Sequence, residues 1–536
     1  MAELLNIRPL DTDHLKKSDQ SNVEEAPEQY KPTGSPVWLI SPNSRSQLTS
    51  YALAQAKQRI YKNLAAICVA FLLNFLAYQN LHNLQVYFRQ DAYVGFVGLT
   101  MLYVVLVVAC LLMPVWVIRH FGCKWTIVCC LVAYVLYMAA HFSQSLMGVV
   151  PSSVLLGLAT APLWVSKCMY VTQLAVDYAM LFGEAEETVI VRFFGIFFMV
   201  VQLAHVLGQI LSGLVLGQLS PPDYLGMNVT DIGEFNGCAQ LQCGSRMVLD
   251  YATNATNAPL SDIQFNNDWY ILCALYLTSS IFAVIIIIFL LDNDSPDARA
   301  VSSSSDKAGL ATAYRQDYSS EEPTAEHVDT SCSWSMLFAT VYQWRDINQL
   351  LIIPLSIYSG LQQAFFFGDI AQDQVTCYSG VWMLIMVLIC YGLVNSASSI
   401  GLGCVTKYIG RLPIFTLGAL IQCCLLVTWK LQPLVPSMFL VFAVLWAIAD
   451  AAWQTQLNTF YSRIFMRSKR EAAFTNYRLW ESVGFIIAFS YSNVACVYVK
   501  IIVLLLMLIL GMLGYFIIEY REKPARESSP LDNGSS

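Results

Sequence analysis

The sequence predicts an all-α membrane protein with twelve transmembrane helices in two six-helix halves. Of its 536 residues, 56% are hydrophobic and 12% are charged, whereas soluble domains carry about 25% charged residues. Apolar runs of roughly 20 residues, the length that crosses a bilayer, recur along the whole chain. Polar marks of the first six runs recur in the same order in the last six, which indicates a duplicated unit.

The apolar runs set the order of the predicted spans. The predicted organisation is a cytosolic N-terminal tail (1–62), a first half (63–291), a cytosolic linker (292–348), a second half (349–518) and a cytosolic C-terminal tail (519–536). The first 60 residues are polar, so no N-terminal signal peptide is expected. The twelve spans cover residues 63–82, 94–117, 124–142, 147–170, 189–216, 269–291, 349–369, 380–404, 412–430, 436–460, 474–492 and 497–518.

The basic residues predict the orientation. With the N-terminus in the cytosol, only four of the 30 Lys and Arg residues face outward, namely Arg89, Arg246, Lys430 and Lys500. Cytosolic loops carry such an excess of basic residues. An even number of spans then returns the C-terminus to the cytosol. A chain with these spans is expected to be in contact with membrane lipid.

The outward loop at 217–268 carries two predicted modifications. Asn228-Val-Thr and Asn254-Ala-Thr are N-glycosylation acceptors. Cys238 and Cys243 lie in the same loop and either form a disulfide in that oxidising compartment or remain two free thiols. The loop is therefore expected to be glycosylated.

The tenth span carries a carboxylate at membrane depth. Asp450, Gln454 and Asn458 lie at i, i+4 and i+8 and share one helix face. A carboxylate at this depth costs about 2.5–3.5 kcal/mol, so it faces protein or water. Either this face lines a central cavity, or Asp450 is a buried carboxyl that hydrogen-bonds a neighbouring helix.

Four marks of the first half recur 280–289 residues later. Tyr78 recurs as Tyr358 and Gly122 as Gly410; Trp164 recurs as Trp453, and Arg192 as Arg478. Parallel halves with a cytosolic central loop resemble the major facilitator fold. That resemblance implies that the first, fourth, seventh and tenth helices line a central cavity, and these helices carry the predicted polar residues Asn74, Tyr78, His82, Gln362, Gln363, Asp450, Gln454 and Asn458.

Three further charged residues lie within predicted spans. Lys167 is predicted to snorkel to the cytosolic interface. Its helix runs toward the cytosol, and Lys167 lies about 10 Å closer to the cytosolic side than Asp450 does. Arg478 and Glu481, at i and i+3, are interpreted as structural charges that pair with each other or with the loop around Arg192.

Four motifs point to a family. The chain resembles the uncoordinated-ninety-three (Unc-93) family, a divergent branch of the major facilitator superfamily, and its A-type members in particular. That resemblance implies a location in the plasma membrane. The resemblance spans the twelve helices and not the tails or linker. Its motifs are Ala77-Tyr-Gln-Asn-Leu-His-Asn-Leu-Gln85, Ala161-Pro-Leu-Trp164, Ala449-Asp-Ala-Ala-Trp-Gln-Thr-Gln456 and Glu471-Ala-Ala-Phe-Thr-Asn-Tyr-Arg-Leu-Trp-Glu481.

Three functions are considered: the resemblance implies the first and the third, and the carboxylate of Asp450 at membrane depth suggests the second. The first is an accessory subunit that modulates a two-pore-domain potassium channel. The second is a secondary transporter of an unknown small molecule, proton-coupled through Asp450. The third is an escort for receptors on their way to endosomes. No nucleophile–base pair, metal cluster or nucleic-acid-binding surface is found in the sequence, so neither an enzyme nor a nucleic-acid-binding protein is expected.

The loop after the second span favours the accessory role. The resemblance to the major facilitator fold implies an Asp in this loop, which normally pairs with a helix end and an Arg and so latches the outward-open state. Here Arg119 stands at that position in the first half, and Lys407 at its counterpart in the second half. Because a base replaces the acid in both halves, we expect the usual latch not to form, although an altered latch remains compatible with alternating access.

Overall fold

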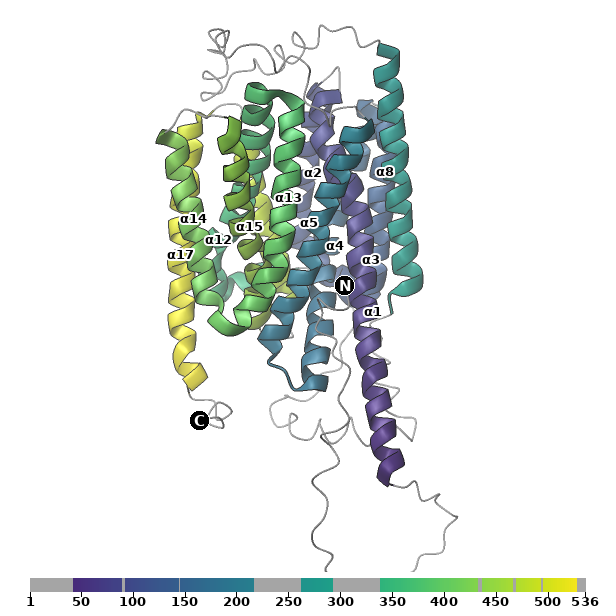
Figure 1. The fold of residues 1–536 in the computed structure, drawn as a ribbon, viewed down its shortest axis with the longest axis vertical. Coiled ribbons are helices and arrows are strands. Elements are labelled where there is room, and N and C mark those ends of the chain that lie inside the picture. The colour runs from purple at the N-terminus through teal and green to yellow at the C-terminus, as the bar shows by residue number, and fades with distance from the viewer. Residues whose placement is uncertain are drawn as a thin grey trace, which may run out of the picture. The chain divides into compact units, whose positions relative to one another are not determined.

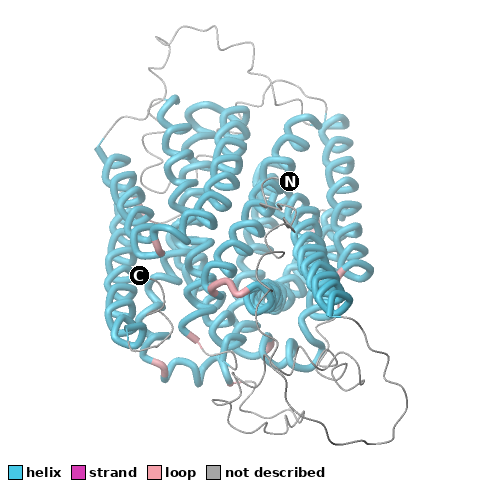
Figure 2. Tube along the Cα trace, turned by 60° about the horizontal axis from the view of Figure 1, so that its bottom comes forward, coloured by secondary structure: helices cyan, strands magenta, loops and turns pink. Residues whose placement is uncertain are grey.

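The computed structural model describes residues 42–88, 92–143, 145–215, 262–292, 338–431, 436–465, 469–492 and 495–527. Apart from short connections, these residues are helical (Figure 2). They fall into two units: one, ending at Leu53, contributes the beginning of the first helix, and the other, Ala54–Ser536, contains every other element.

Helices of the first half follow the predicted order. They are α1 (Pro42–Phe88), α2 (Ala92–Leu112), α3 (Pro114–Ala140), α4 (Leu146–Phe182), α5 (Glu186–Val215) and α8 (Asp262–Leu290) (Figure 1).

The second half has the corresponding order. Its helices are α12 (Ile347–Ala364), the π-helical segment η10 (Phe365–Val375), α13 (Thr376–Ile409), α14 (Arg411–Leu431), α15 (Pro436–Ile464), α16 (Arg470–Ser492) and α17 (Val497–Glu527). The loop expected between residues 369 and 380 is therefore helical, and the prediction of a loop there is wrong.

Ten of these helices are long and apolar enough to cross a membrane, which confirms an all-α, multi-pass membrane protein. The other two candidates are α2 and α16. Within α2 only Met101–Leu112 qualifies as an apolar stretch, and α16 carries four charged residues: Arg470, Glu471, Arg478 and Glu481. The number of twelve spans and the predicted domain limits remain predictions.

The turn after the second span has the same backbone in both halves. Gly122 lies at φ 73°, ψ 168°, and Gly410 at φ 73°, ψ 179°. This positive φ is a region that glycine occupies without the strain of a Cβ. The sequence match between Gly122 and Gly410 is thus also a structural match.

Helix pairs between the halves follow a two-fold pattern. The fifth helix, α5, packs on the eighth, α13, and the second, α2, packs on the eleventh, α16. If each helix is replaced by its counterpart in the other half, six helices along the chain, the α5–α13 pair becomes the α16–α2 pair. The same replacement converts the α4–α16 pair into the α15–α5 pair, which also packs together. The interface between the halves is therefore the one expected for a parallel repeat.

Glycines allow two of these helix pairs to approach closely. A Cβ on Gly195 of α5 would lie 2.8 Å from the carbonyl oxygen of Ser399 on α13, and Gly403 lies opposite. At Gly401, by contrast, a Cβ would meet nothing within 4 Å. Small residues permit such contacts between membrane helices.

Candidate functional site

Asp450, in the middle of α15, lies inside the second-half helices and is 1% exposed. Its carboxylate accepts hydrogen bonds from Gln362 of α12 and from two residues of α13, Tyr391 (2.7 Å) and Asn395 (2.9 Å). All three donors are neutral. The structure thus places Asp450 in a polar network that joins α12, α13 and α15.

Further hydrogen bonds hold Gln362 in place. Its amide oxygen accepts from Gln422 (3.0 Å) and from the indole of Trp446 (2.9 Å). The amide oxygen of Gln422 accepts in turn from Trp453 at 2.7 Å and from the hydroxyl of Tyr358. This geometry corresponds to the buried-carboxyl alternative for Asp450. We call the set the Asp450 network: Asp450, Gln362, Tyr391, Asn395, Gln422, Trp446, Trp453 and Tyr358.

A separate cavity of about 120 Å³ lies between the halves. Helices α1 to α4 contribute one side of it, and α12 and α16 the other. Two of the predicted site residues, Tyr78 and Gln363, lie on its wall, whereas Asp450 does not. The lining comprises Phe75, Tyr78, Gln79, Leu102, Tyr103, Leu106, Tyr134, Thr160, Ala161, Trp164, Gln363, Arg478, Glu481, Ser482 and Phe485.

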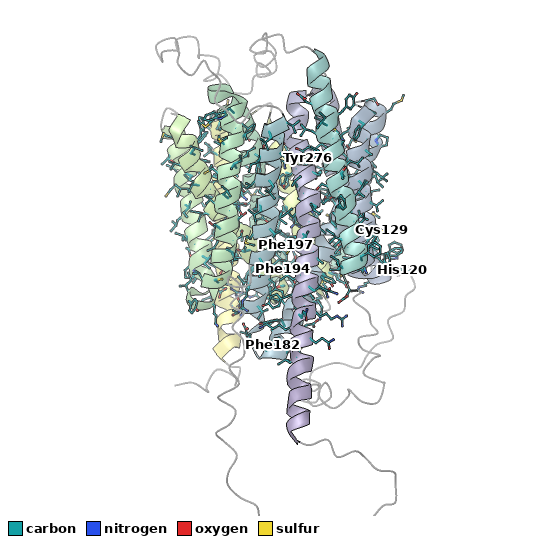
Figure 3. All side chains as sticks on the ribbon, turned by 45° about the vertical axis from the view of Figure 1, so that its right-hand side comes forward. His120, Cys129, Phe182, Phe194, Phe197 and Tyr276 are labelled. Atoms are coloured by element: carbon teal, nitrogen blue, oxygen red, sulfur yellow. The ribbon has the colours of Figure 1, made fainter. Side chains whose placement is uncertain are left out.

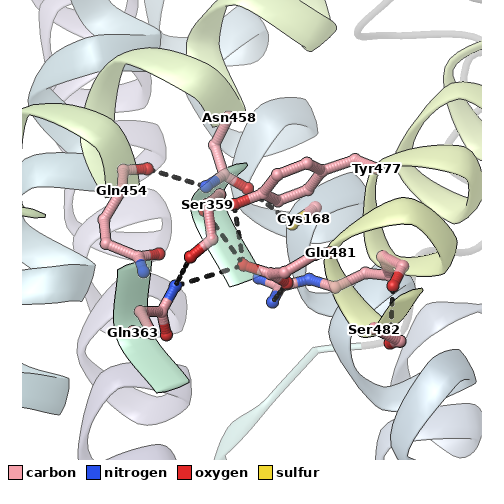
Figure 4. A network of polar contacts seen from close by, with 9 residues as sticks. Cys168, Ser359, Gln363, Gln454, Asn458, Tyr477, Glu481 and Ser482 are labelled. Carbon is pink, nitrogen blue, oxygen red and sulfur yellow. Dashed lines mark hydrogen bonds and ion pairs between the residues drawn. The ribbon is translucent and has the colours of Figure 1, made fainter. Parts of the chain in front are cut away.

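An ion pair lies on the wall of this cavity. Arg478 donates to Glu481, and their side chains are 11% and 4% exposed. The second carboxylate oxygen of Glu481 accepts from Tyr477 (3.1 Å), Ser359 (3.3 Å) and Gln363 (3.4 Å), as Figure 4 shows. The predicted pairing is confirmed, but it lies at the cavity, eight residues or about 12 Å into α16.

The predicted residues Gln454, Asn458 and Asn74 are not part of this wall. Cys168 of α4 donates at 3.2 Å to Asn458, whose own amide donates at 2.7 Å to the carbonyl oxygen of Gln454 (Figure 4). Asn458 therefore links α15 to the first half. Asn74 is fully buried and has no hydrogen-bond partner among the described residues. His82 belongs to α1, but its side chain is outside the described part.

Lys167 does not reach the cytosolic interface, so that prediction is wrong. It is fully buried, and its amine lies over four aromatic rings, 4.3 Å from the centre of Phe197 and 4.7 Å from that of Trp164. Phe194, labelled with Phe197 in Figure 3, is a third member of this cage. The cause is the length of α4, which continues for 15 residues, about 22 Å, beyond Lys167.

The ends of α5 and α16 carry ion pairs between the halves. Arg119, beside the Gly122 turn, donates to Glu471 at the start of α16 (2.6 Å). Further ion pairs between the halves join Arg470 to Glu186 (2.8 Å), Arg463 to Glu187 (2.7 Å) and Arg411 to Glu187 (3.5 Å). The acid of the usual latch is absent, as expected, yet a contact of reversed charge takes its place.

Some predicted features lie outside the described residues. These are the two sequons at Asn228 and Asn254 and the cysteines Cys238 and Cys243. They remain predictions.

A family model described as "Ion channel regulatory protein UNC-93" matches residues 89–516. Protein unc-93 homolog A of Xenopus laevis is 33% identical over 464 residues, which cover 86% of this chain and 93% of that protein. A Caenorhabditis elegans protein, named provisionally as the potassium channel regulatory protein unc-93, is 30% identical over 86% of this chain and 61% of its own length.

Solved structures show the same fold. The major facilitator proton:xylose symporter XylE, bound to 6-bromo-6-deoxy-D-glucose, superposes with a TM-score of 0.56 at 9% identity, covering 87% of this chain and 96% of the symporter. The helices, the order of their pairs and the sequence relatives agree. The chain belongs to the Unc-93 family and has a major-facilitator-like fold.

Proposed function

We propose that this protein is a non-enzymatic accessory subunit that modulates a potassium channel in the membrane. The similarity to the Caenorhabditis elegans protein over 86% of this chain supports the proposal most directly. The family model, whose description names ion channel regulation, extends through nearly all the helices. Because the similarity covers the helical body, the regulatory surface is expected to belong to that body.

The partner that we propose is a two-pore-domain potassium channel. Such a complex forms within the bilayer, where helices with exposed apolar side chains are available for contact. The outer faces of α8 and α17 carry many such side chains, among them Phe282 and Phe289 on α8 and Leu506 and Phe516 on α17. Lipid covers these faces when no partner does.

Whole-cell potassium current tests the proposal. Cells express each channel of a two-pore-domain panel with this protein, or with an unrelated major facilitator carrier at equal surface density. We expect this protein, and not the carrier, to change the current of at least one channel at constant channel surface density. Unchanged currents across the panel, with no channel recovered after mild solubilisation, would contradict the proposal.

We further propose residence in the plasma membrane with both termini in the cytosol. The positive charge of the predicted cytosolic loops supports this orientation. Complex-type glycans on Asn228 and Asn254, resistant to endoglycosidase H and lost in Asn→Gln variants, are the expected result. Antibody access to a C-terminal tag in intact cells would contradict the orientation.

A specific observation favours a second function, secondary transport of a small solute. The cavity lies between the two halves, and proteins of this fold include symporters. Proton coupling through Asp450 receives less support, because its carboxylate is satisfied by donors of the second half and is not on the cavity wall. Solute uptake into proteoliposomes distinguishes this function from channel regulation.

A further inference from the structure

Three cationic side chains from two helices meet at the C-terminal end of α8. Arg59 and Lys62 of α1 contact the carboxylate of Asp292 at 2.8 Å and 2.7 Å. Lys124 of α3 donates at 3.0 Å to the carbonyl oxygen of Ile288, about one helical turn before Asp292. Figure 1 shows this end of α8 next to α1. We call Arg59, Lys62 and Lys124 the α8-end cluster.

Positive charge is in excess at this cluster. Its three cations contact a single carboxylate, that of Asp292, among the described residues. The C-terminus of a helix adds only about half a negative elementary charge. The complementary ligand is therefore an anion.

The cations of α1 are accessible to such a ligand. The side chain of Arg59 is 63% exposed and that of Lys62 is 45% exposed. Arg59 donates to Asp292 through Nε, so its two terminal nitrogens remain available on the exposed side chain. Charged donors of this kind form strong hydrogen bonds with phosphate oxygens.

An exposed apolar face of α8 leads up to the cluster. Phe282, Ile285 and Phe289 lie at i, i+3 and i+7, on one side of the helix. They are 55%, 41% and 79% exposed. Asp292 follows Phe289 by three residues. A ligand with an anionic head and an apolar chain would match both parts of this surface.

Trp125 indicates the depth of the cluster in the membrane. Its ring is beside the amine of Lys124, 5.7 Å from it, and the residue is 47% exposed. Exposed tryptophans are enriched at the level of the lipid headgroups. The cations thus lie where a headgroup would be, and the apolar face of α8 lies where acyl chains would be.

We propose that the α8-end cluster binds the headgroup of one anionic phospholipid, whose acyl chains lie along Phe282, Ile285 and Phe289. The phosphate accepts hydrogen bonds from the terminal nitrogens of Arg59 and from the remaining N–H groups of the two lysines. In the orientation proposed above, this lipid belongs to the cytosolic leaflet, where anionic lipids are concentrated. Binding by the purified chain depends neither on that orientation nor on a channel, so its failure would leave both proposals untouched.

Native mass spectrometry of the full-length protein, treated with glycosidase and held in detergent, tests the proposal. It counts bound lipids and separates phosphatidylglycerol from phosphatidylcholine with the same acyl chains. We expect one phosphatidylglycerol to bind at least about tenfold more tightly than phosphatidylcholine, because only the former carries a net negative charge. Equal binding of the two lipids would overturn the proposal. So would displacement of phosphatidylglycerol by an equal concentration of glycerol phosphate, which has no acyl chain.

Single substitutions locate the site. Arg59→Gln and Lys62→Gln should each weaken binding of phosphatidylglycerol about fivefold, the contribution of one cation near a charged lipid surface. Lys57→Gln is the matched control on the same helix, because its amine lies over the ring of Phe182 on α4, 5.4 Å from the ring centre. It should change the affinity less than about twofold. Equal losses in Lys57→Gln and Arg59→Gln would show diffuse attraction and overturn the site.

Asp292→Asn provides the opposite sign. It removes the carboxylate that competes with the headgroup for Arg59 and Lys62. Binding of phosphatidylglycerol should therefore tighten about fivefold. This result decides the question even where Arg59→Gln does not fold, because weaker binding in Asp292→Asn would contradict a headgroup on these side chains.

Discussion

Asp450 shows how a carboxylate at membrane depth is stabilised without a cation. Three neutral side chains, Gln362, Tyr391 and Asn395, donate to its two oxygens. Hydrogen bonds to a charged group contribute about 1.5–3 kcal/mol each, which is enough together to offset the cost of about 2.5–3.5 kcal/mol for placing the acid in the membrane. The network therefore accounts for Asp450 without a transport role.

Asp450→Asn is predicted to lower the melting temperature. An amide has only one oxygen, so its NH₂ group would face a donor, either Gln362 or the pair Tyr391 and Asn395. A buried donor left without an acceptor costs about 1–3 kcal/mol. Thermal unfolding of the purified protein measures the effect, and surface expression serves as a second readout. An unchanged melting temperature would mean that the carboxyl is protonated and already offers a donor.

Sequence reasoning identified Asp450 and Gln362 but not the other members of the Asp450 network. Tyr391 and Gln422 are single polar residues within apolar runs, and Asn395 begins a stretch that contains serines. Their place in the network depends on how α13 and α14 are rotated. Lys167 and Arg478 were misplaced for a different reason. The apolar pattern predicted that α4 ends earlier, and that α16 begins later, than they do in the structure. Residues that lie deep in the bundle were therefore assigned to its edge.

At the scale of elements, glycine was informative where the repeat marked it. The matching Gly122 and Gly410 turns followed from the repeat. The contact between α12 and α16 was not predicted, because Gly360 and Gly484 stand alone in the sequence. A Cβ on Gly484 would lie 2.3 Å from the carbonyl oxygen of Ile357, too close for any side chain.

Gly484→Ala is therefore predicted to destabilise the protein. The methyl group must push α16 away from α12, and overpacking of this kind costs about 1–3 kcal/mol. Gly401→Ala is the matched control, since a Cβ there meets nothing within 4 Å and alanine favours the helix. A lower melting temperature is expected for Gly484→Ala alone. Equal effects of the two substitutions would contradict the close approach.

The end of α8 is tied to α1 by Asp292. Its carboxylate accepts from Arg59 (2.8 Å), Lys62 (2.7 Å) and Asn63 (3.2 Å). Partial burial raises the pKa of Asp292, but the hydrogen bonds from Lys62, Arg59 and Asn63 outweigh it, so the pKa lies below its ordinary value of 3.8. The charged form is thus the one that the fold stabilises.

This contact predicts a pH-dependent difference between wild type and Asp292→Asn. A carboxyl whose pKa is lowered on folding stabilises the protein above its unfolded pKa and loses that contribution as the pH falls through the folded pKa. We expect the wild type to melt higher by a constant amount from pH 8 to about pH 5. The difference should shrink below the ordinary pKa of 3.8. A difference that grows on acidification would contradict the assignment.

At the scale of the whole molecule, the two halves are joined by charges of opposite polarity to the usual latch. Arg119 and Glu471 form one contact. Near the start of α5, Glu187 forms ion pairs with Arg411 and Arg463. The starts of α5 and α16 are exchanged by the two-fold repeat, so the two contacts occupy corresponding places. Reversal of sign thus preserves an attraction between the halves where the acid of the usual sequence motif is missing.

A charge reversal tests whether Arg119 and Glu471 hold the halves together. Arg119→Glu places two carboxylates in contact, whereas Arg119→Glu combined with Glu471→Arg restores the attraction with the polarity of the usual motif. Partly exposed ion pairs contribute only about 0.2–1 kcal/mol, so global stability is a poor readout. Amide hydrogen exchange at the start of α16 is more sensitive, because it reports local opening.

Exchange at the start of α16 should rise in the Arg119→Glu protein and return to the wild-type rate in the double variant. Glu471→Arg alone should behave like Arg119→Glu, since it also pairs like charges. A double variant with the summed effect of the two single variants would show that the residues are not coupled. Restoration would instead show that attraction between these positions, whatever its polarity, closes this end of the interface between the halves.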